Sequence, residues 1–442
     1  MSAAARPAQP EPDAAPASLD GLRVVLDAHG SDRGFGTGLS TYARTLHAAL
    51  ASLNADASWL FGRDMGAGDA LEREVSFVDP PTASVGLRRS AGALARAGEA
   101  VLSGHVRAPR IPEQRITTTA PGEAYPRGFN GRGLFRRANF RHEFLGLRTE
   151  VSLAGPCDVF HMTVPLPIRV REARNVVTIH DLIPLRLPTT TPDDKLRYLR
   201  KVRRCAQEAD LVLTVSEASR SDILEFLDLA PEKVVNTYQT SLLQPLGDAD
   251  RATSAQRLSR HGLKPGEYAL FIGALEPKKN LARLLRAFLD ADTSLTLAVA
   301  GPKAWFWEKQ VEELGSIDPD LAARRIRFLG YVPDADLPHL LDGAAFLAFP
   351  SLMEGFGLPA LEAMRCGCPV LTSRTPALEE VTGGAALLVD PHDEASIRSG
   401  IETLAGEESR RTALAAAGLE RAAFFSMERY RRRLFDAYAR LM

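Results

Sequence analysis

With 442 residues, the chain exceeds what one compact hydrophobic core accommodates and suits two domains of ordinary size. Its apolar content of 45%, charged content of 25% and net charge of −1 are those of an ordinary globular enzyme and give no reason to expect nucleic-acid binding. The sequence contains no run of about 18 apolar residues, so no segment is expected to span a bilayer.

The first folded element is expected near Leu22. Residues 1–19 are rich in Ala and Pro and contain no apolar core segment, so we interpret them as a disordered tail rather than a signal peptide. The apolar RVVLD that follows is typical of a buried strand, and a glycine-rich loop then leads into an amphipathic helix, which is a Rossmann-like opening. In that loop, Gly36, Thr37 and Gly38 could bring the backbone close to a phosphate, although such turns are common without that function.

The first half of the chain alternates apolar strand candidates with helical stretches such as residues 193–209. This alternation predicts a parallel sheet covered by helices on both faces, in an N-terminal domain that we place at residues 20–245. Residues from about 85 to 148 break the rhythm with Gly, Pro and Arg, and we expect them to form an irregular insert. The strand candidates are residues 75–78, 158–161, 176–180 and 211–215.

The insert is strongly basic. Between Arg88 and Glu150 the sequence has twelve Arg, five Glu and no Lys. Its segment GRGLFRRANFR alternates arginines with apolar side chains and could contact anionic lipid headgroups at the inner membrane, or a phosphorylated acceptor. A solvated arginine-rich face is the alternative. The arginines are Arg132, Arg136, Arg137 and Arg141, and the apolar residues are Leu134, Phe135 and Phe140.

A histidine and an aspartate end the apolar stretch VTIHDLIP. His180 and Asp181 follow the strand directly, and the carboxyl ends of parallel strands face the ligand-binding side of such a sheet. From there, His180 could hold a sugar hydroxyl or a phosphate oxygen. A histidine with a purely structural hydrogen bond is the alternative.

The second half repeats the α/β pattern after the polar stretch 247–259, with a helix expected at residues 280–290. We assign residues 246–425 to a C-terminal domain, and two such domains imply a cleft between them that binds ligands. A last helix at residues 426–442 packs either on its own domain or back on the first. The strand candidates are residues 268–272, 295–300, 326–329, 345–349, 370–372 and 386–389.

A pair of lysines lies near the start of this domain, in LFIGALEPKKN. Gly273 ends the strand, and Lys278, Lys279 and Asn280 lead into the next helix. A lysine held at the cleft could neutralise a diphosphate as negative charge builds on its departure. Two adjacent lysines on a loop are otherwise simply solvated, so their place beside the cleft carries the functional interpretation.

The most informative segment is SLMEGFGLPALEAMRCGCP, residues 351–369, which reads as a loop and a helix after an apolar strand. Gly355 and Gly357 let the loop backbone approach a ligand, and the helix start offers unpaired N–H groups and a positive dipole end that suit a diphosphate. Glu354 would then lie beside the group attached to that phosphate, and Glu362 could accept hydrogen bonds from a ribose diol. Together these features predict a site for an activated sugar.

Neither acidic triplets nor cysteines predict a metal site. Each of three D-x-D triplets lies among polar residues rather than directly after a buried strand, and none has a third ligand. The four cysteines are scattered, and without a histidine near Cys366 and Cys368 they favour a reduced, cytoplasmic protein. Ser216 and Glu217 fit a helix N-cap and its first-turn acid rather than a nucleophile. The triplets begin at Asp248, Asp290 and Asp334.

These segments together resemble family 4 of the retaining glycosyltransferases, whose members have the GT-B fold of two Rossmann-like domains. The likeness runs from about Leu22 to the end of the chain and is most specific in the E-x7-E element of Glu354 and Glu362. Three further segments are similar to sequences of the bacterial branch that transfers mannose and related hexoses into O-antigen, capsule or exopolysaccharide. They are VVTIHDLIPLRLP, ADLVLTVSEASRSDI and EPKKN. The resemblance implies a GDP- or UDP-hexose donor, a saccharide or lipid-linked acceptor at the inner membrane, and no metal or other cofactor.

Matched by position, the resemblance implies a role for each candidate residue. Glu354 contacts hydroxyls of the donor hexose, Glu362 contacts the nucleotide ribose, Lys279 balances the diphosphate, and His180 lies near the sugar. The family retains anomeric configuration by front-side attack without an enzymatic nucleophile, so the protein orients the reactants and stabilises charge. The other donor-site residues are Gly36, Gly38, Gly273, Lys278, Phe356, Gly357 and Leu358.

The chain departs from the family pattern at two places. Ala274 stands where many relatives carry an Arg that contacts phosphate, a loss for which Lys278 could compensate, and residues 236–239 read NTYQ where many show P-N-G. An epimerase or phosphorylase on the same fold would need other catalytic acids or a cofactor lysine, and no such motif is found. A catalytically silent scaffold subunit is the other alternative, which Ala274 permits and the intact glutamates, lysine and histidine disfavour.

Overall fold

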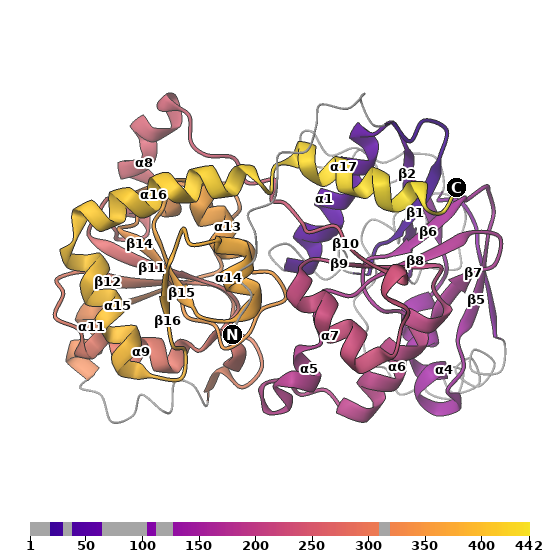
Figure 1. Ribbon diagram of the computed structural model, residues 1–442, viewed down its shortest axis with the longest axis horizontal. Coiled ribbons are helices and arrows are strands. Elements are labelled where there is room, and N and C mark those ends of the chain that lie inside the picture. The colour runs from indigo at the N-terminus through magenta and orange to yellow at the C-terminus, as the bar shows by residue number, and fades with distance from the viewer. Residues whose placement is uncertain (1–17, 30–37, 64–103, 112–126, 309–318) are drawn as a thin grey trace, which may run out of the picture.

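The computed structural model describes residues 18–29, 38–63, 104–111, 127–308 and 319–442. They form two large β-sheets of parallel strands, and helices cover both faces of each sheet. The two halves lie side by side along the long axis of the molecule (Figure 1). The expected α/β fold of two Rossmann-like domains is confirmed.

Within the described residues, the N-terminal sheet has seven parallel strands in the order β10-β9-β8-β6-β1-β2-β4. A smaller sheet, β3-β5-β7, lies beside it. Apolar residues on both faces of the central strands are buried, which is why these strands read as continuous apolar runs in the sequence. The strands are β1 (Arg23–Asp27), β2 (Asp56–Phe61), β3 (His105–Ala108), β4 (Gly128–Asn130), β5 (Thr149–Leu153), β6 (Val159–Met162), β7 (Ile168–Val170), β8 (Arg174–Thr178), β9 (Leu211–Thr214) and β10 (Val234–Asn236).

The segment expected to be an irregular insert contains regular elements where the structure describes it. Strand β3 pairs with β5, β4 joins the main sheet beside β2, and helix α4 (Leu134–Leu145) follows. The prediction of irregularity was wrong for these parts because strands of three or four residues that pair with distant segments leave no local pattern. The apolar residues Leu134 and Phe135 begin α4 and are buried, so of the three that we grouped with the arginines only Phe140 is exposed. The strand expected at residues 75–78 lies outside the described residues.

The part of the C-terminal sheet that the structure describes has six parallel strands in the order β13-β12-β11-β14-β15-β16. Strands β11 and β14 lie at its centre, and every residue of β14 is buried. This position explains why the strand reads as an unbroken apolar run. The strands are β11 (Tyr268–Ile272), β12 (Thr296–Ala300), β13 (Ile326–Gly330), β14 (Phe346–Phe349), β15 (Val370–Ser373) and β16 (Leu387–Val389).

Helices connect the strands, and much of the polar stretch 247–259 forms one of them, α8, which buries only Ser254 and Leu258. Among the described helices, none is long and apolar enough to cross a membrane. Besides α4, the helices are α1 (Gly38–Ser52), α5 (Ile183–Arg186), α6 (Lys195–Glu208), α7 (Glu217–Leu227), α8 (Asp248–Arg260), α9 (Leu281–Asp290), α11 (Pro319–Arg325), α12 (Leu337–Gly343), α13 (Leu358–Arg365), α14 (Pro376–Thr382), α15 (Glu394–Gly406), α16 (Glu408–Ala423) and α17 (Met427–Ala439). Single 3-10 turns occur at η3 (Pro188–Thr190), η4 (Pro231–Lys233) and η5 (Pro277–Lys279).

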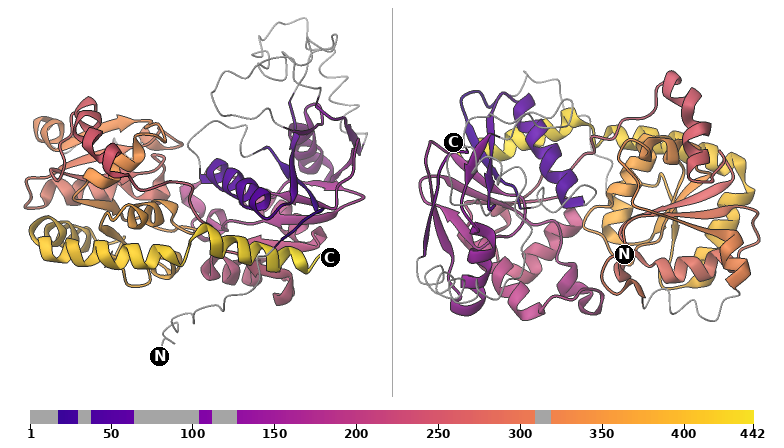
Figure 2. Two further views of the ribbon diagram at one scale, coloured as in Figure 1. Left: turned by 90° about the horizontal axis from the view of Figure 1, so that it is seen from above. Right: turned by 180° about the vertical axis from the view of Figure 1, so that it is seen from behind.

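The last helix, α17, returns to the N-terminal domain and lies against α1 (Figure 2). Its Tyr438 hydroxyl is 2.7 Å from Nδ1 of His161 on β6, and Nε2 of the same ring is 2.7 Å from the Thr178 hydroxyl. The Tyr42 hydroxyl of α1 lies 2.8 Å from Thr178. The final helix therefore completes the polar interior of the first domain.

Candidate active site

The candidate residues gather where the carboxyl ends of the two sheets face each other. From the C-terminal domain come the turn after β11 and the loop between β14 and α13, and from the N-terminal domain come the residues after β8. The two sides are in direct contact, because a Cβ added to Gly355 would lie 2.5 Å from the backbone oxygen of His180. The close approach of the backbones is the physical reason for glycine at this position.

A buried ion pair joins two of the predicted catalytic residues. Nζ of Lys279, in the turn η5, lies 2.7 Å from Oε1 of Glu354, and the two side chains are only 12% and 8% exposed. Burial alone would raise the pKa of Glu354, but the charges of Lys279 and Lys278 outweigh it and the net pKa is lowered. Glu354 is therefore ionised at neutral pH. Lys279 also lies 4.9 Å above the ring centre of Phe349 at the end of β14.

Lys278 lies among three carboxylates. Its Nζ is 3.5 Å from Oε1 of Glu276. Burial would lower the pKa of Lys278, but Asp181 of the other domain, Glu354 and Glu276 together raise it, so the side chain stays charged. Its backbone oxygen also accepts a hydrogen bond of 2.8 Å from the N–H of Leu352. This bond ties the turn after β11 to the loop after β14.

Helix α13 begins directly after the loop that carries Glu354. Its N-cap, Gly357, has φ of +102°, which only glycine adopts without strain. Phe356 is buried, and Leu358 is the first helical residue. The first-turn N–H groups of an eight-residue helix thus lie next to the Glu354–Lys279 pair, which is the arrangement that suits a phosphate.

Glu362 lies in the same helix but has a different environment. Its Oε1 accepts a hydrogen bond of 2.8 Å from the Ser241 hydroxyl. Burial raises the pKa of Glu362 to about 7, and the negative charge of Asp334 adds to this shift. Ser241 could not be predicted from the sequence, since a serine five residues beyond the end of the short strand β10 carries no local signal of contact with a distant helix.

His180 follows β8 and its ring is fixed from two sides. Its Nε2–H donates to the backbone oxygen of Thr163, 2.9 Å away, and the ring of Tyr42 packs edge-on at 4.5 Å. Burial lowers the pKa of His180, so the imidazole is neutral at physiological pH. A hydrogen bond from Nε2 leaves Nδ1 as the acceptor atom of the neutral ring.

The remaining predicted residues lie at different distances from this cluster. Gly38 is the first residue of α1, and Gly36 lies outside the described residues. Gly273 follows β11, and a Cβ there would be 3.5 Å from the Lys279 side chain.

Ser216 is the N-cap of α7, as predicted, and its hydroxyl accepts the N–H of Ser219. Within the described ranges, no group of three His, Cys, Asp or Glu side chains is arranged to hold a metal ion.

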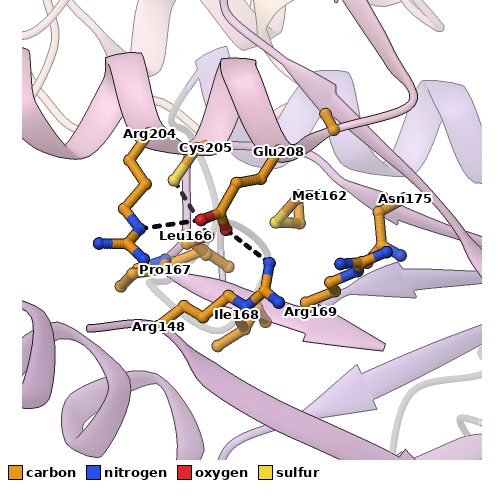
Figure 3. Close-up of a pocket in the computed structure, with 11 residues that line it drawn as sticks. Arg148, Met162, Leu166, Pro167, Ile168, Arg169, Asn175, Arg204, Cys205 and Glu208 are labelled. Atoms are coloured by element: carbon orange, nitrogen blue, oxygen red, sulfur yellow. Dashed lines mark hydrogen bonds and ion pairs between the residues drawn. The ribbon is translucent and has the colours of Figure 1, made fainter. Parts of the chain in front are cut away.

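Two pockets of the described surface lie away from the candidate site. One, of about 10 Å³, is shown in Figure 3, where Glu208 lies between Arg148 and Arg204 at 2.9 Å from each. The other is a groove of about 600 Å³ between α4 and α6. Neither is lined by a residue that the sequence analysis assigned to the donor site.

Comparison with known proteins identifies the family. Residues 257–421 match the model of the family Glycosyl transferases group 1. Over 282 residues the chain is 36% identical to O-antigen chain mannosyltransferase B of Escherichia coli, covering 62% of this chain and 71% of that relative. The chain belongs to the glycosyl transferases group 1. The resemblance drawn from its motifs is thus confirmed.

Other similar proteins are more distant. The serotype-specific mannosyltransferase WbdA of Escherichia coli is 29% identical over 289 residues, which is 63% of this chain but 35% of that longer protein. Among solved structures, sucrose-phosphate synthase from Thermosynechococcus elongatus has a TM-score of 0.66 at 17% identity, covering 95% of this chain and 99% of its own. HepE of Anabaena, in complex with UDP and glucose, has a TM-score of 0.61 at 16% identity, covering 95% of this chain and 100% of its own. At these identities the structures support the fold alone.

Proposed function

We propose that this group 1 glycosyltransferase transfers mannose, with retention of configuration, from GDP-mannose to a saccharide or lipid-linked saccharide of a bacterial surface polysaccharide. The first relatives that match are mannosyltransferases, two of them named for O-antigen chains. The observation that carries the proposal is the buried Glu354–Lys279 pair beside the start of α13. It combines a fixed anion for sugar hydroxyls with a fixed cation for a diphosphate.

In this proposal the C-terminal domain binds the nucleotide diphosphate. Lys279 and Lys278 face the phosphates together with the backbone N–H groups of Phe356, Gly357 and Leu358, and the positive end of α13 adds to their field. Charge that builds on the departing GDP is stabilised by groups that are already in place, so little reorganisation is needed during the reaction.

The two glutamates then bind different parts of the donor. Glu354, ionised and held by Lys279, accepts hydrogen bonds from mannose hydroxyls, and Glu362 accepts them from the ribose diol. His180 meets the sugar from the opposite domain through its Nδ1 acceptor. The acceptor hydroxyl attacks on the face that GDP leaves, and contact between the two domains excludes water that would hydrolyse the donor. The reaction needs no metal or other cofactor in this scheme.

A surface of helix α4 supports a further part of the proposal, contact with the cytoplasmic face of the inner membrane. Phe140 and Phe144 lie one turn apart, are 41% and 67% exposed, and have ring centres 4.2 Å apart. Helical spacing places Arg136 and Arg137 on the two sides of this aromatic pair. Exposed aromatic rings flanked by cations are the composition that binds anionic lipid headgroups. Vesicles with anionic lipid should retain the protein in flotation, and Phe140→Ser with Phe144→Ser should abolish that retention without changing transfer to a short water-soluble acceptor.

The function is tested with purified protein, a panel of GDP-, UDP- and ADP-hexoses and an extract of lipid-linked saccharides, with and without EDTA. We expect release of GDP from GDP-mannose only, at a rate unchanged by EDTA, and an α-linked product by NMR, since GDP-mannose is α-configured. Turnover of a different hexose, or a β-linked product, would contradict the proposal. Binding of nucleotide sugars without any turnover would favour the scaffold alternative.

A further inference from the structure

The first turn of α7 in the N-terminal domain lies against the donor loop of the C-terminal domain. The Ser216 hydroxyl donates a hydrogen bond of 2.6 Å to the backbone oxygen of Gly355. The Ser219 hydroxyl, one turn on, is 3.1 Å from the same oxygen and 2.8 Å from the backbone oxygen of His180. Both serines are buried, with 0% and 4% exposure. Two short side chains therefore hold residues from both halves of the candidate site at once.

A carboxylate of the other domain reinforces this contact. Glu380 on α14 accepts hydrogen bonds from the backbone N–H of Glu217, 2.7 Å away, and of Ala218, 3.0 Å away. Because Ser216 accepts the next N–H, that of Ser219, the first-turn donors of α7 are satisfied partly by the partner domain. Helices α7 and α14 meet at the centre of the molecule in Figure 1.

The hydrogen bonds at Gly355 fix the direction of a neighbouring donor. In a trans peptide the C=O and the following N–H point in opposite directions. With its oxygen directed at the two serines, the peptide that joins Gly355 to Phe356 must direct the Phe356 N–H away from α7. That N–H is one of the groups that the proposed function assigns to the donor diphosphate.

We propose that Ser216 and Ser219 are positioning residues of this enzyme, which hold the Gly355–Phe356 peptide and His180 in one arrangement when the domains are closed. They touch neither donor nor acceptor and act through the loop that carries Glu354. The inference rests on the proposed function for what the loop binds, but the contact itself and its effect on domain closure do not depend on the identity of the sugar.

This role predicts a characteristic energetic pattern. When the domains separate, the Gly355 oxygen is hydrated, so loss of the serine hydroxyls does not weaken either domain through this atom. In the closed state, a buried carbonyl without a donor is strongly unfavourable. The effect should therefore appear in domain closure and in kcat rather than in the stability of the fold. The Gly355 oxygen can accept two hydrogen bonds, and the single hydroxyl proton of Ser219 can turn from the His180 oxygen to the Gly355 oxygen. Either serine can therefore partly replace the other as donor to Gly355.

The experiment compares Ser216→Ala, Ser219→Ala and the double variant in the full-length protein. We expect kcat to fall about fivefold in each single variant and about fiftyfold in the double variant, with the donor KM within about twofold of the unmodified enzyme. Ser219→Ala is the cleaner variant, because it leaves the N-cap of α7 in place, and its melting temperature should fall only slightly, since within the N-terminal domain it loses the single bond to the His180 oxygen. Ser254→Ala is the matched control, a buried serine bonded to Nδ1 of His339 at 2.8 Å within the C-terminal domain, and its kcat should equal that of the unmodified enzyme.

Small-angle scattering gives a second measurement that needs no turnover. With saturating GDP or UDP, the unmodified protein should have a smaller radius of gyration than the double variant, which stays partly open. Equal radii, or Ser219→Ala and the double variant transferring sugar at the unmodified rate, would overturn the positioning role while leaving the proposed function intact. If the unmodified protein transfers no mannose, the proposed function fails, and the scattering comparison still decides the role of the serines.

Discussion

The two glutamates of one short motif have opposite electrostatic environments. Glu354, in the loop, forms a buried ion pair with Lys279, and its pKa is lowered. Glu362, in the helix that follows, has a hydroxyl group of Ser241 as its partner, and its pKa is raised to about 7. Eight residues therefore separate an acid that is ionised at neutral pH from one whose pKa is raised to about 7.

This difference in pKa indicates that the two glutamates have different roles in binding the donor. A carboxylate paired with a buried lysine has a fixed charge and a fixed geometry, which is what orientation of a reacting sugar requires. A buried carboxylate whose main partner is a neutral hydroxyl can adjust to a ligand that supplies two hydroxyl donors. Four substitutions test whether the two glutamates have these separate roles, and they are given in order of decreasing effect.

The largest effect is expected for Glu354→Ala. It removes the group that we assign to the sugar and leaves the buried Lys279 without its partner, so kcat should fall by at least about 10³-fold. Nucleotide affinity should change little, because the phosphate contacts remain. Steady-state transfer and calorimetric titration with GDP measure the two quantities. Glu379→Ala, on the exposed face of α14, is the control, and an unaltered rate in Glu354→Ala would refute the role of this residue.

Lys279→Met should come next, with a loss of about 10²-fold in kcat, because it removes a positive charge from the departing diphosphate. It also removes the charge that lowers the pKa of Glu354, so the variant should regain part of its activity as the pH rises and Glu354 ionises again. The measurement is a pH–rate profile between pH 6 and 9. A profile parallel to that of the unmodified enzyme would show that Lys279 does not control the ionisation of Glu354.

Glu362→Gln should mainly raise the donor KM, by about tenfold, and change how stability depends on pH. The folded state holds the Glu362 proton up to a pH of about 7, and an ordinary glutamate releases it near 4.5. Between these values the folded state binds more protons than the unfolded chain, so the contribution of this group to the free energy of unfolding decreases as the pH rises through this window.

Glutamine cannot titrate, so the variant should lose this decrease and show a flatter stability profile from pH 5 to 7. Urea unfolding at pH 5, 6, 7 and 8 for both proteins measures it. Parallel profiles would mean that Glu362 titrates normally and that its environment differs less from that of Glu354 than the structure indicates.

The smallest effect is expected for Asp334→Asn. The negative charge of Asp334 contributes to the raised pKa of Glu362, so its removal should move the Glu362 titration to lower pH. The ion pair of Asp334 with Arg44, at 3.3 Å and exposed, contributes less than about 1 kcal/mol to stability. The pH dependence of the donor KM measures the shift, and Asp320→Asn on α11 is an exposed control.

Much of this site could be predicted from the sequence because its residues follow buried strands. Glu354, Lys279 and His180 each lie shortly after an apolar run, and parallel topology brings such ends together. The opposite environments of Glu354 and Glu362 could not be predicted, because they depend on Ser241 and Asp334, which come from distant segments. The hydrogen bonds of Ser216 and Ser219 to the backbone oxygens of Gly355 and His180 could not be predicted either. The sequence identified an N-cap correctly but carried no sign of what lies across the domain boundary.

The predicted fold was accurate where strands are central and apolar, as at β11, whose bounds match the predicted residues. It missed the short edge strands β3, β4 and β10, since three or four residues with one neighbour carry little hydrophobic pattern. It also missed β2 and β5, which lie between two other strands. Helix α8 was read as a polar stretch because it buries just two side chains. Tertiary contact, rather than local preference, decides these elements.

The return of α17 to the first domain has a consequence for biosynthesis. Residues 20–245 leave the ribosome long before Tyr430 and Tyr438, whose rings fill space between α1 and β6. Until the last helix is translated, His161 of the nascent N-terminal half lacks the Tyr438 hydroxyl as its hydrogen-bond partner. The first domain is thus completed only at the end of translation. A fragment of residues 20–245 should therefore need α17 as a separate peptide to fold completely.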